Sequence, residues 1–167
     1  MITETSRTSP KIILYQPEIA QNLGAIFRLC SCFGVRLEVI EPCGFPFSSK
    51  ALKRVIMDYG EVSSVVRHTS FQKYCDQISS MSDESRMILF STKGNKCIWN
   101  FKFNSGDHLF FGNEGHGVPE NVAQKADAKV FIPMLGQGRS LNLAMSAGIA
   151  LGEVTRQLLL KENNCKP

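Results

Sequence analysis

The stretch from Ile132 to Leu143 (IPMLGQGRSLNL) combines residue types that can hold a small ligand. Pro133 ends a short apolar run because it lacks a backbone N–H donor, and the glycines of Gly136–Gly138 allow a tight turn. Ser140 and Asn142 are residue types that cap helices, and the free N–H groups behind a cap can bind an oxygen or a carboxylate. The pattern is equally typical of an ordinary capped junction between a strand and a helix.

A guanidinium is the second group that could do chemistry. Apolar spacing from Leu23 to Phe33 predicts a helix that Asn22 caps and Gly34 ends. Gly24 and Arg28 lie four residues apart on another face of this helix. Helical side chains lean toward the N-terminus, so Arg28 would extend over Gly24 toward the end of the preceding strand. A solvated surface arginine is the alternative.

The densest basic cluster lies on a predicted helix from Lys50 to about Tyr59. Lys50, Lys53 and Arg54 are close together there and could hold phosphates. A solvated helix face, balanced by nearby acidic residues, explains the same pattern at least as well.

Six apolar runs predict the strands that position these groups: Lys11 to Tyr15, Val35 to Ile40, Val62 to Val66, Met87 to Phe90, Leu109 to Phe111 and Val130 to Ile132. Helices alternate with most of them, which predicts an α/β fold: a mostly parallel six-stranded sheet with helices on both faces. Ligands of open α/β sheets bind outside the carboxyl ends of the strands. The loops Ser91–Gly94, Gly112–Gly117 and Leu135–Ser140 should therefore share one site with Arg28.

The composition limits the classes of function. With 167 residues and 43% hydrophobic content, one domain over residues 1–167 can bury a core without disulfides or metal. No apolar run approaches the length of about 18 residues that a membrane span needs, and the start lacks a signal peptide's apolar region, so we expect a cytoplasmic protein. Six cysteines form no CxxC pair, which favours buried thiols over a metal site. A net charge of +4 permits a polyanionic partner.

Common nucleotide and hydrolase motifs do not fit. The glycines at 136 and 138 resemble the start of GxGxxG, but Leu141 occupies the third glycine position and only one helix and a tail follow. The GxxxxGK[ST] phosphate loop and the GxSxG elbow are both missing from the sequence. A dehydrogenase, a P-loop enzyme and an α/β hydrolase are therefore disfavoured.

Three motifs follow one another along the chain: Asn22-x-Gly24-x-x-x-Arg28, Phe111-Gly112-Asn113-Glu114-Gly115-His116-Gly117-Val118-Pro119, and Ile132-Pro133-Met134 with Ser140-Leu141-Asn142-Leu143. In sequence, order and spacing they resemble the SPOUT superfamily of RNA methyltransferases, its SpoU branch in particular. The likeness covers nearly the whole chain. Leu14 to Ile19, Ile40 to Pro42 and Asp58-Tyr59, together with the lack of an added RNA-binding domain, resemble the minimal TrmL subfamily, which methylates the ribose of the tRNA wobble nucleotide, position 34.

The resemblance implies a C-terminal deep trefoil knot, which general rules of chain topology would not predict. It also implies that S-adenosylmethionine binds in the knot through the three loops. The implied contacts of this cofactor are Phe90, Gly112, Ile132 and Ser140, with Leu141 lining the adenine pocket. A homodimer is implied as well, in agreement with the small residues Ala144, Ala147, Gly148, Ala150 and Gly152 along the last helix.

The implied reaction is methyl transfer to a ribose 2′-hydroxyl. A methyl sulfonium is already a strong electrophile, so the enzyme must place the hydroxyl in line and help to remove its proton. Arg28 is the implied catalytic residue, and because a guanidinium keeps its proton we expect it to hold a phosphate and stabilise alkoxide charge. Glu114, Ser140 and Asn142 are expected to orient the ligand and Arg28. The expected RNA contacts are Asn22, Lys50, Lys53, Arg54 and Tyr59, the last by stacking on a base.

Two alternatives remain open on the sequence. The loop Asn113 to His116 stands where TrmL proteins tend to have a Pro-Glu-Thr type loop, and it is closer to relatives that modify other tRNA positions or ribosomal RNA. A non-catalytic RNA-binding module of the same fold is the second alternative. The presence of Arg28, Glu114, Ser140 and Asn142 argues against it.

Overall fold

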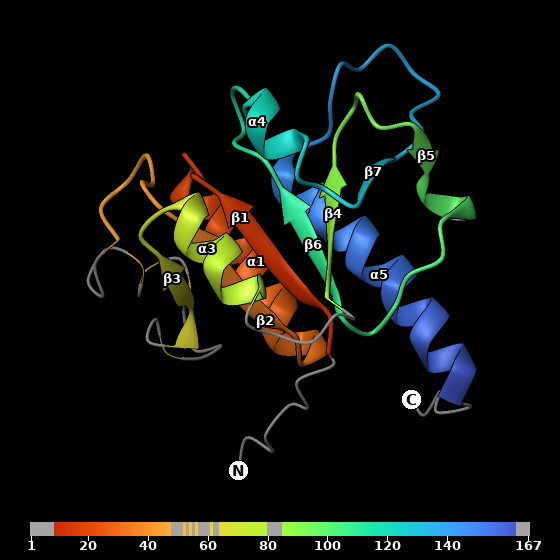
Figure 1. The fold of residues 1–167 in the computed structure, drawn as a ribbon, viewed down its shortest axis with the longest axis horizontal. Coiled ribbons are helices and arrows are strands. Elements are labelled where there is room, and N and C mark those ends of the chain that lie inside the picture. Colours follow the sequence, from red (N-terminus) through yellow and green to blue (C-terminus); the bar gives the residue numbers. More distant parts are fainter. Residues whose placement is uncertain are drawn as a thin grey trace.

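The computed structural model of the protein describes residues 9–47, 52, 54, 56, 61, 64–79 and 85–162, with side chains described as far as 158 (Figure 1). Strands and helices alternate along most of the chain. In order they are β1 (Lys11–Tyr15), α1 (Ala20–Phe33), β2 (Arg36–Ile40), β3 (Val66–His68), α3 (Phe71–Ser79), β4 (Arg86–Phe90), β5 (Lys96–Cys97), the 3-10 helix η3 (Ile98–Asn100), β6 (Asp107–Phe111), α4 (Glu120–Ala123), β7 (Ala128–Phe131) and α5 (Leu143–Glu162).

The strands form one sheet in the order β3-β2-β1-β6-β4-β7-β5, and every pairing is parallel. Central strands such as β1 (KIILY) and β6 (DHLFF) are buried along their whole length. Strands of this kind read as almost continuous apolar runs. The predicted α/β fold with a parallel sheet is confirmed, but the sheet has seven strands rather than six. The extra strand, β5, is two residues long at the sheet edge, and no apolar run marks it.

Helices cover both faces of the sheet (Figure 1). On one face, α1 and α5 pack over side chains such as Ile12 and Leu14 of β1. On the other face, α3 and α4 pack over side chains such as Ile13 and Tyr15. Successive side chains of a strand point to opposite faces, so β1 contributes alternately to both cores. None of the helices in the described part of the chain has the length and apolar character that a membrane crossing needs.

Helix α1 differs from the prediction at its start and agrees with it at its end. The helix begins at Ala20, with Ile19 as N-cap and no hydrogen bond from a capping side chain of its own. Asn22 therefore does not cap it; the side chain is buried inside the first turn. Gly34 ends the helix with φ of 65°, a left-handed conformation that glycine adopts without steric cost.

The third strand lies further along the chain than predicted. It spans Val66–His68 instead of Val62 to Val66, and it pairs with Glu38 to Ile40 of β2. Two of its three residues are polar, so an apolar pattern could not locate it. Of the helix predicted from Lys50 to about Tyr59, Leu52, Arg54 and Ile56 are helical, and Leu52 and Ile56 are buried in the core under α1.

A buried polar network crosses the sheet on the α3 face. Glu38 of β2 binds Lys11 Nζ at 3.0 Å and His68 Nε2 at 2.8 Å. Burial alone would raise the pKa of Glu38, but the hydrogen bond from His68 and the charge and hydrogen bond of Lys11 outweigh burial and lower it. Tyr74 of α3 contacts His108 Nδ1 through its hydroxyl at 3.1 Å. Burial, followed by the charge of Lys11, lowers the pKa of His108 to about 4.

The low pKa of His108 predicts a loss of stability in acid. The unfolded chain takes up a proton on this residue below its ordinary pKa of 6.5, whereas the folded chain does so only near 4. Unfolding is therefore accompanied by proton uptake in this window. As the pH is lowered from 6.5 to about 4, the free energy of unfolding should fall by roughly 3 kcal/mol. Urea titrations across this range should show a shallower pH slope for His108→Gln. His116→Gln, at an exposed histidine, is the control, and equal slopes for wild type and His108→Gln would contradict the assignment.

Candidate functional site

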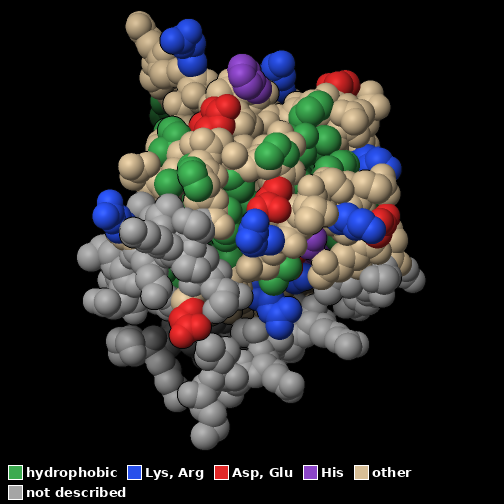
Figure 2. Space-filling model, turned by 90° about the vertical axis from the view of Figure 1, so that its left-hand side faces the viewer, with side chains coloured by type: hydrophobic (Ala, Val, Ile, Leu, Met, Phe, Trp, Pro, Cys, Tyr) green, Lys and Arg blue, Asp and Glu red, His purple; other side chains and the backbone are tan. Residues whose placement is uncertain are grey.

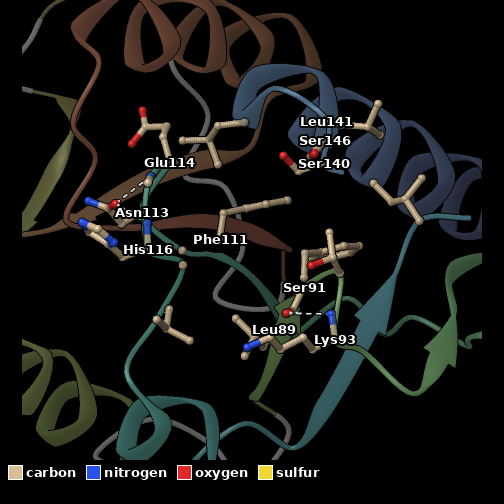
Figure 3. Close-up of a pocket in the computed structure, with 18 of the residues that line it drawn as sticks. Leu89, Ser91, Lys93, Phe111, Asn113, Glu114, His116, Ser140, Leu141 and Ser146 are labelled. Carbon is tan, nitrogen blue, oxygen red and sulfur yellow. Dashed lines mark hydrogen bonds between the residues drawn. The ribbon is translucent and has the colours of Figure 1, made fainter. Parts of the chain in front are cut away.

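A cavity of about 580 Å³ opens beyond the carboxyl ends of β4, β6 and β7. The three loops predicted to share a site line it together. In Figure 3, Ser140, Leu141 and Ser146 lie on one side of the cavity, Ser91 and Lys93 on the opposite side, and Glu114 in the loop after β6. The cavity is lined by all five residues that the family resemblance implied as cofactor contacts: Phe90, Gly112, Ile132, Ser140 and Leu141.

The loop after β6 is a closed turn that requires glycine at two positions. Asn113 and Gly117 exchange backbone hydrogen bonds of 2.8 and 2.9 Å, and Gly117 has φ of +69°. A Cβ added at Gly112 would lie 2.6 Å from the carbonyl carbon of Gly117, so only glycine fits there. Asn113 holds the turn by accepting hydrogen bonds from the backbone N–H groups of Gly115 and His116. The motif Phe111 to Pro119 included Asn113 without a role for it, although an Asn side chain that binds the backbone two residues on is a typical Asx turn.

Glu114 joins this loop to the start of α1. Its carboxylate accepts hydrogen bonds from the backbone N–H groups of Glu18 at 2.7 Å and Ile19 at 3.1 Å. It also accepts one from Asn22 Nδ2 at 3.1 Å. The first N–H groups of a helix have no partner within the helix and carry partial positive charge, which a carboxylate satisfies. Glu114 therefore supplies, from 92 to 96 residues away, the cap that was expected from Asn22.

Asn142 extends the same chain of hydrogen bonds to α5. Its Nδ2 donates to Asn22 Oδ1 at 3.0 Å. Its Oδ1 accepts from the backbone N–H groups of Ala144 at 2.8 Å and Met145 at 3.3 Å, so it caps α5 as predicted. The polar atoms of the buried Asn22 are thus both engaged, one by Glu114 and one by Asn142. The result is a continuous link between the loop after β6, α1 and α5.

The loop before α5 is more open than the sequence suggested. Leu135 to Asn142 are exposed. A Cβ added at Gly136 or Gly138 would meet nothing within 4 Å, and neither glycine has a positive φ. The chain does bend at Gly136 and Gln137, but neither a positive φ nor a close neighbour requires glycine there. The helix begins at Leu143, one residue after Asn142, so Ser140 lies on the cavity wall and not at the cap position.

Arg28 stands apart from the cavity wall. It is an exposed residue of α1, six positions after Asn22, which corresponds to about 9 Å along the helix axis. It is not among the described residues that line the cavity. Gly24, over which it was expected to extend, is buried. Arg54 is exposed, and Lys50, Lys53 and Tyr59 lie outside the described residues.

Two of the cysteines, Cys30 and Cys43, lie in surroundings that keep their thiols protonated. Burial raises the pKa of Cys30 to about 12. Burial, reinforced by the charge of Glu41, raises the pKa of Cys43 to about 11. Both thiols therefore stay protonated near neutral pH. No group of three His, Cys, Asp or Glu side chains in the described residues could hold a metal ion.

Comparison with known proteins assigns this arrangement to a family. A family model described as the SpoU rRNA Methylase family matches residues 9–152. The chain belongs to the SpoU methylase family. The family resemblance inferred from the three motifs is thereby confirmed.

Individual relatives of this SpoU methylase are named for reactions on RNA. A tRNA (cytidine(34)-2'-O)-methyltransferase of Beijerinckia indica is 42% identical over 147 residues, which cover 88% of this chain and 91% of the relative. A solved structure described as "Structural insights into the 2-OH methylation of C/U34 on tRNA" matches with a TM-score of 0.82 at 37% identity, covering 92% of this chain and 98% of the other. An AdoMet-bound rRNA methyltransferase from Sinorhizobium meliloti matches with a TM-score of 0.78 at 25% identity, covering 90% of this chain and 57% of the other.

Proposed function

We propose that this protein transfers the methyl group of S-adenosylmethionine to the ribose 2′-hydroxyl of nucleotide 34 of tRNA. The main structural support for methyl transfer is the cavity at the carboxyl ends of the strands. Hydrogen bonds from Asn22 to Glu114 and from Asn142 to Asn22 connect its loops to α1. The choice of tRNA and of nucleotide 34 rests on the relatives named for that reaction, at 37–42% identity.

The cavity fits S-adenosylmethionine in size and in chemistry. About 580 Å³ is within the range of small-molecule sites, and the wall offers apolar side chains such as Leu141 beside polar groups such as Ser140. The crowded backbone at Gly112 and the backbone of Ile132 approach the cavity from two loops. When bound, the cofactor supplies an electrophilic methyl group. The C-terminal trefoil knot that the family resemblance implies stays a prediction for this chain.

The protein's own task is to place the ribose and to handle the proton of its 2′-hydroxyl. Arg28 holds the phosphate next to the target ribose and stabilises the developing oxyanion, because its guanidinium stays protonated. Glu114, Asn22 and Asn142 fix α1, and thus Arg28, relative to the cavity. Ser140 orients the cofactor. With its amide buried and engaged, Asn22 acts in this proposal by positioning α1.

The working unit proposed here is a homodimer. Near the start of α5, Leu141 and Met145 are 39% and 61% exposed. Further along the same helix, a Cβ added at Gly148 or Gly152 would meet nothing within 4 Å. An exposed apolar surface beside small residues lets a second helix approach closely. Light scattering of the purified protein would test this, and a monomer at micromolar concentration would contradict it.

A direct assay tests the function. The protein should transfer label from S-adenosylmethionine to bulk tRNA, and mapping of the product should place the methyl group on the 2′-oxygen of nucleotide 34. Ribosomal RNA is the parallel substrate in the same assay. Label in ribosomal RNA but not in tRNA would overturn the substrate, and no cofactor binding by calorimetry would favour a non-catalytic RNA-binding module.

Gly112 in the cavity wall and Gly136 in the open loop before α5 give a matched test of the cofactor loops. Gly112→Ala places a methyl group 2.6 Å from the backbone of Gly117, so the loop must shift. Affinity for S-adenosylmethionine, measured by calorimetry, should fall by more than about tenfold, since each 1.4 kcal/mol is a factor of ten. Gly136→Ala makes the same chemical change in open space and should bind as the wild type does. Equal affinities of the two variants would contradict a role for Gly112.

A further inference from the structure

At the β3 edge of the sheet, an arginine side chain lies over an aromatic ring. The guanidinium carbon of Arg67, on edge strand β3, lies over the ring of Phe47 at 4.5 Å from its centroid. Glu41 fixes it from the side: Arg67 Nε donates to Glu41 Oε1 at 3.0 Å, and Arg67 Nη2 donates to the same oxygen. The Arg67 side chain is nevertheless 46% exposed. Figure 2 views the molecule from the side on which β3 lies and shows basic, acidic and hydrophobic side chains next to one another on this surface.

This group, Glu41–Arg67–Phe47, is connected to the candidate site through the backbone. Glu41 follows β2, and its carbonyl oxygen accepts a hydrogen bond from Gln16 Nε2 at 3.5 Å. The carbonyl oxygen of Gln16 accepts one from Asn113 Nδ2 at 2.8 Å. Asn113 in turn organises the loop after β6 that lines the cavity. Strand β3 lies three strands away from β6, which is about 14 Å at the usual strand spacing of about 4.8 Å, so an extended single strand would span the two places within a few nucleotides.

The chemistry of the group favours a base over a phosphate. Glu41 neutralises the charge of Arg67, which weakens attraction to a phosphate, whereas stacking on a guanidinium plane needs no net charge. One face of that plane is occupied by Phe47, and the held orientation removes the entropy cost of ordering a long side chain. Proteins recognise unpaired RNA bases by stacking them on aromatic rings and on arginine planes.

We propose that Glu41–Arg67–Phe47 binds an unpaired nucleobase within a few nucleotides of the methylated nucleotide. The base stacks on the outer face of the Arg67 guanidinium, while Phe47 supports the inner face and Glu41 prevents its rotation. This inference rests on the proposed function, because it assumes a single-stranded RNA substrate in the cavity. It adds a substrate-binding site outside the cavity wall.

Steady-state kinetics on tRNA tests the site. Arg67→Ala should raise the KM for tRNA about tenfold, in the range of one lost base stack, and leave kcat and the affinity for S-adenosylmethionine within about twofold of wild type. Arg67→Lys should be as defective, because an ammonium is a point charge without a plane. Arg36→Ala is the control: this exposed arginine at the start of β2 lies at the end of the sheet opposite the cavity and should not change KM. A wild-type KM for Arg67→Ala or for Arg67→Lys would overturn the stacking role.

Modified substrates identify the base. In a set of tRNA molecules, each carries one abasic nucleotide at a different position within three nucleotides of nucleotide 34. One of them should raise the KM of the wild-type protein. That increase should vanish in Arg67→Ala, because the two changes remove the same contact. Full additivity of the two changes would overturn the inference. If wild-type protein methylates no tRNA at all, the proposed function itself has failed, and the two failures are thus distinguishable.

Discussion

Replacing Arg28 by alanine is expected to abolish methyl transfer while binding of S-adenosylmethionine persists. Arg28 lies outside the residues that line the cavity, so its loss leaves the cofactor walls unchanged. Its proposed partners, a phosphate and a developing oxyanion, belong to the RNA. Removing a single donor to such an oxyanion typically lowers kcat by about a hundredfold to a thousandfold. Single-turnover assays with saturating tRNA, next to calorimetry with the cofactor, separate the two effects.

Arg36→Ala is the matched control for Arg28→Ala. Arg36 is an exposed arginine at the start of β2, at the opposite end of the sheet from the carboxyl ends that carry the cavity. The Arg36→Ala protein should methylate tRNA at the wild-type rate. Turnover of Arg28→Ala equal to that of Arg36→Ala would remove Arg28 from the catalytic assignment. A parallel loss of cofactor affinity would instead make it part of the cofactor site.

Glu114→Gln is expected to slow methyl transfer about a hundredfold with only a small loss of stability. The two carboxylate oxygens of Glu114 accept hydrogen bonds from the N–H groups of Glu18 and Ile19, one each. Glutamine replaces one of these oxygens by an NH₂ group, which donates and cannot accept, so one of the two hydrogen bonds is lost. These N–H groups lie near solvent, so the cost in free energy of unfolding should be that of a lost helix cap, about 1 kcal/mol. The catalytic cost is larger because a shift of about 1 Å in a positioning element can lower a rate about a hundredfold. Urea denaturation and single-turnover rates measure the two quantities.

Asp76→Asn controls for the loss of a carboxylate. Asp76 is exposed on α3 and accepts a hydrogen bond from Gln72 at 2.8 Å, on the face of the sheet opposite α1. For Asp76→Asn, neither the free energy of unfolding nor the rate of methyl transfer should change measurably. If Glu114→Gln lost several kcal/mol of stability and its rate fell only in proportion to the folded fraction, Glu114 would be structural and the positioning role would be excluded.

Much of the candidate site could be predicted from local sequence. The glycines of the loop after β6, the proline after Ile132 and the Asn142 cap each act through their own backbone geometry or nearest neighbours. The same holds for the end of α1 at Gly34 and for the long apolar strands β1 and β6. These features depend on sterics and on burial along one segment, so spacing alone determines them.

Other features depended on residues far apart in the sequence. Asn22 was predicted to cap α1, and the structure shows instead that Glu114 satisfies the start of this helix. Strand β3 was placed too early and β5 was missed, because short edge strands form through pairing with a neighbour. The open surroundings of Gly136 and Gly138 are likewise a matter of what packs nearby.

The sequence by itself thus determined the parallel α/β fold, the three loops at one sheet edge and the family of the chain, because periodicity and motif spacing are local properties. Only the tertiary structure decided how the loops, α1 and α5 are joined. The link runs from Glu114 through Asn22 to Asn142, across 92 and 120 residues of chain. The grouping of Glu41, Arg67 and Phe47 also exists only in the folded protein. Hydrogen bonds and stacking act over a few ångströms in space, and no spacing along the chain specifies which distant residues will come that close.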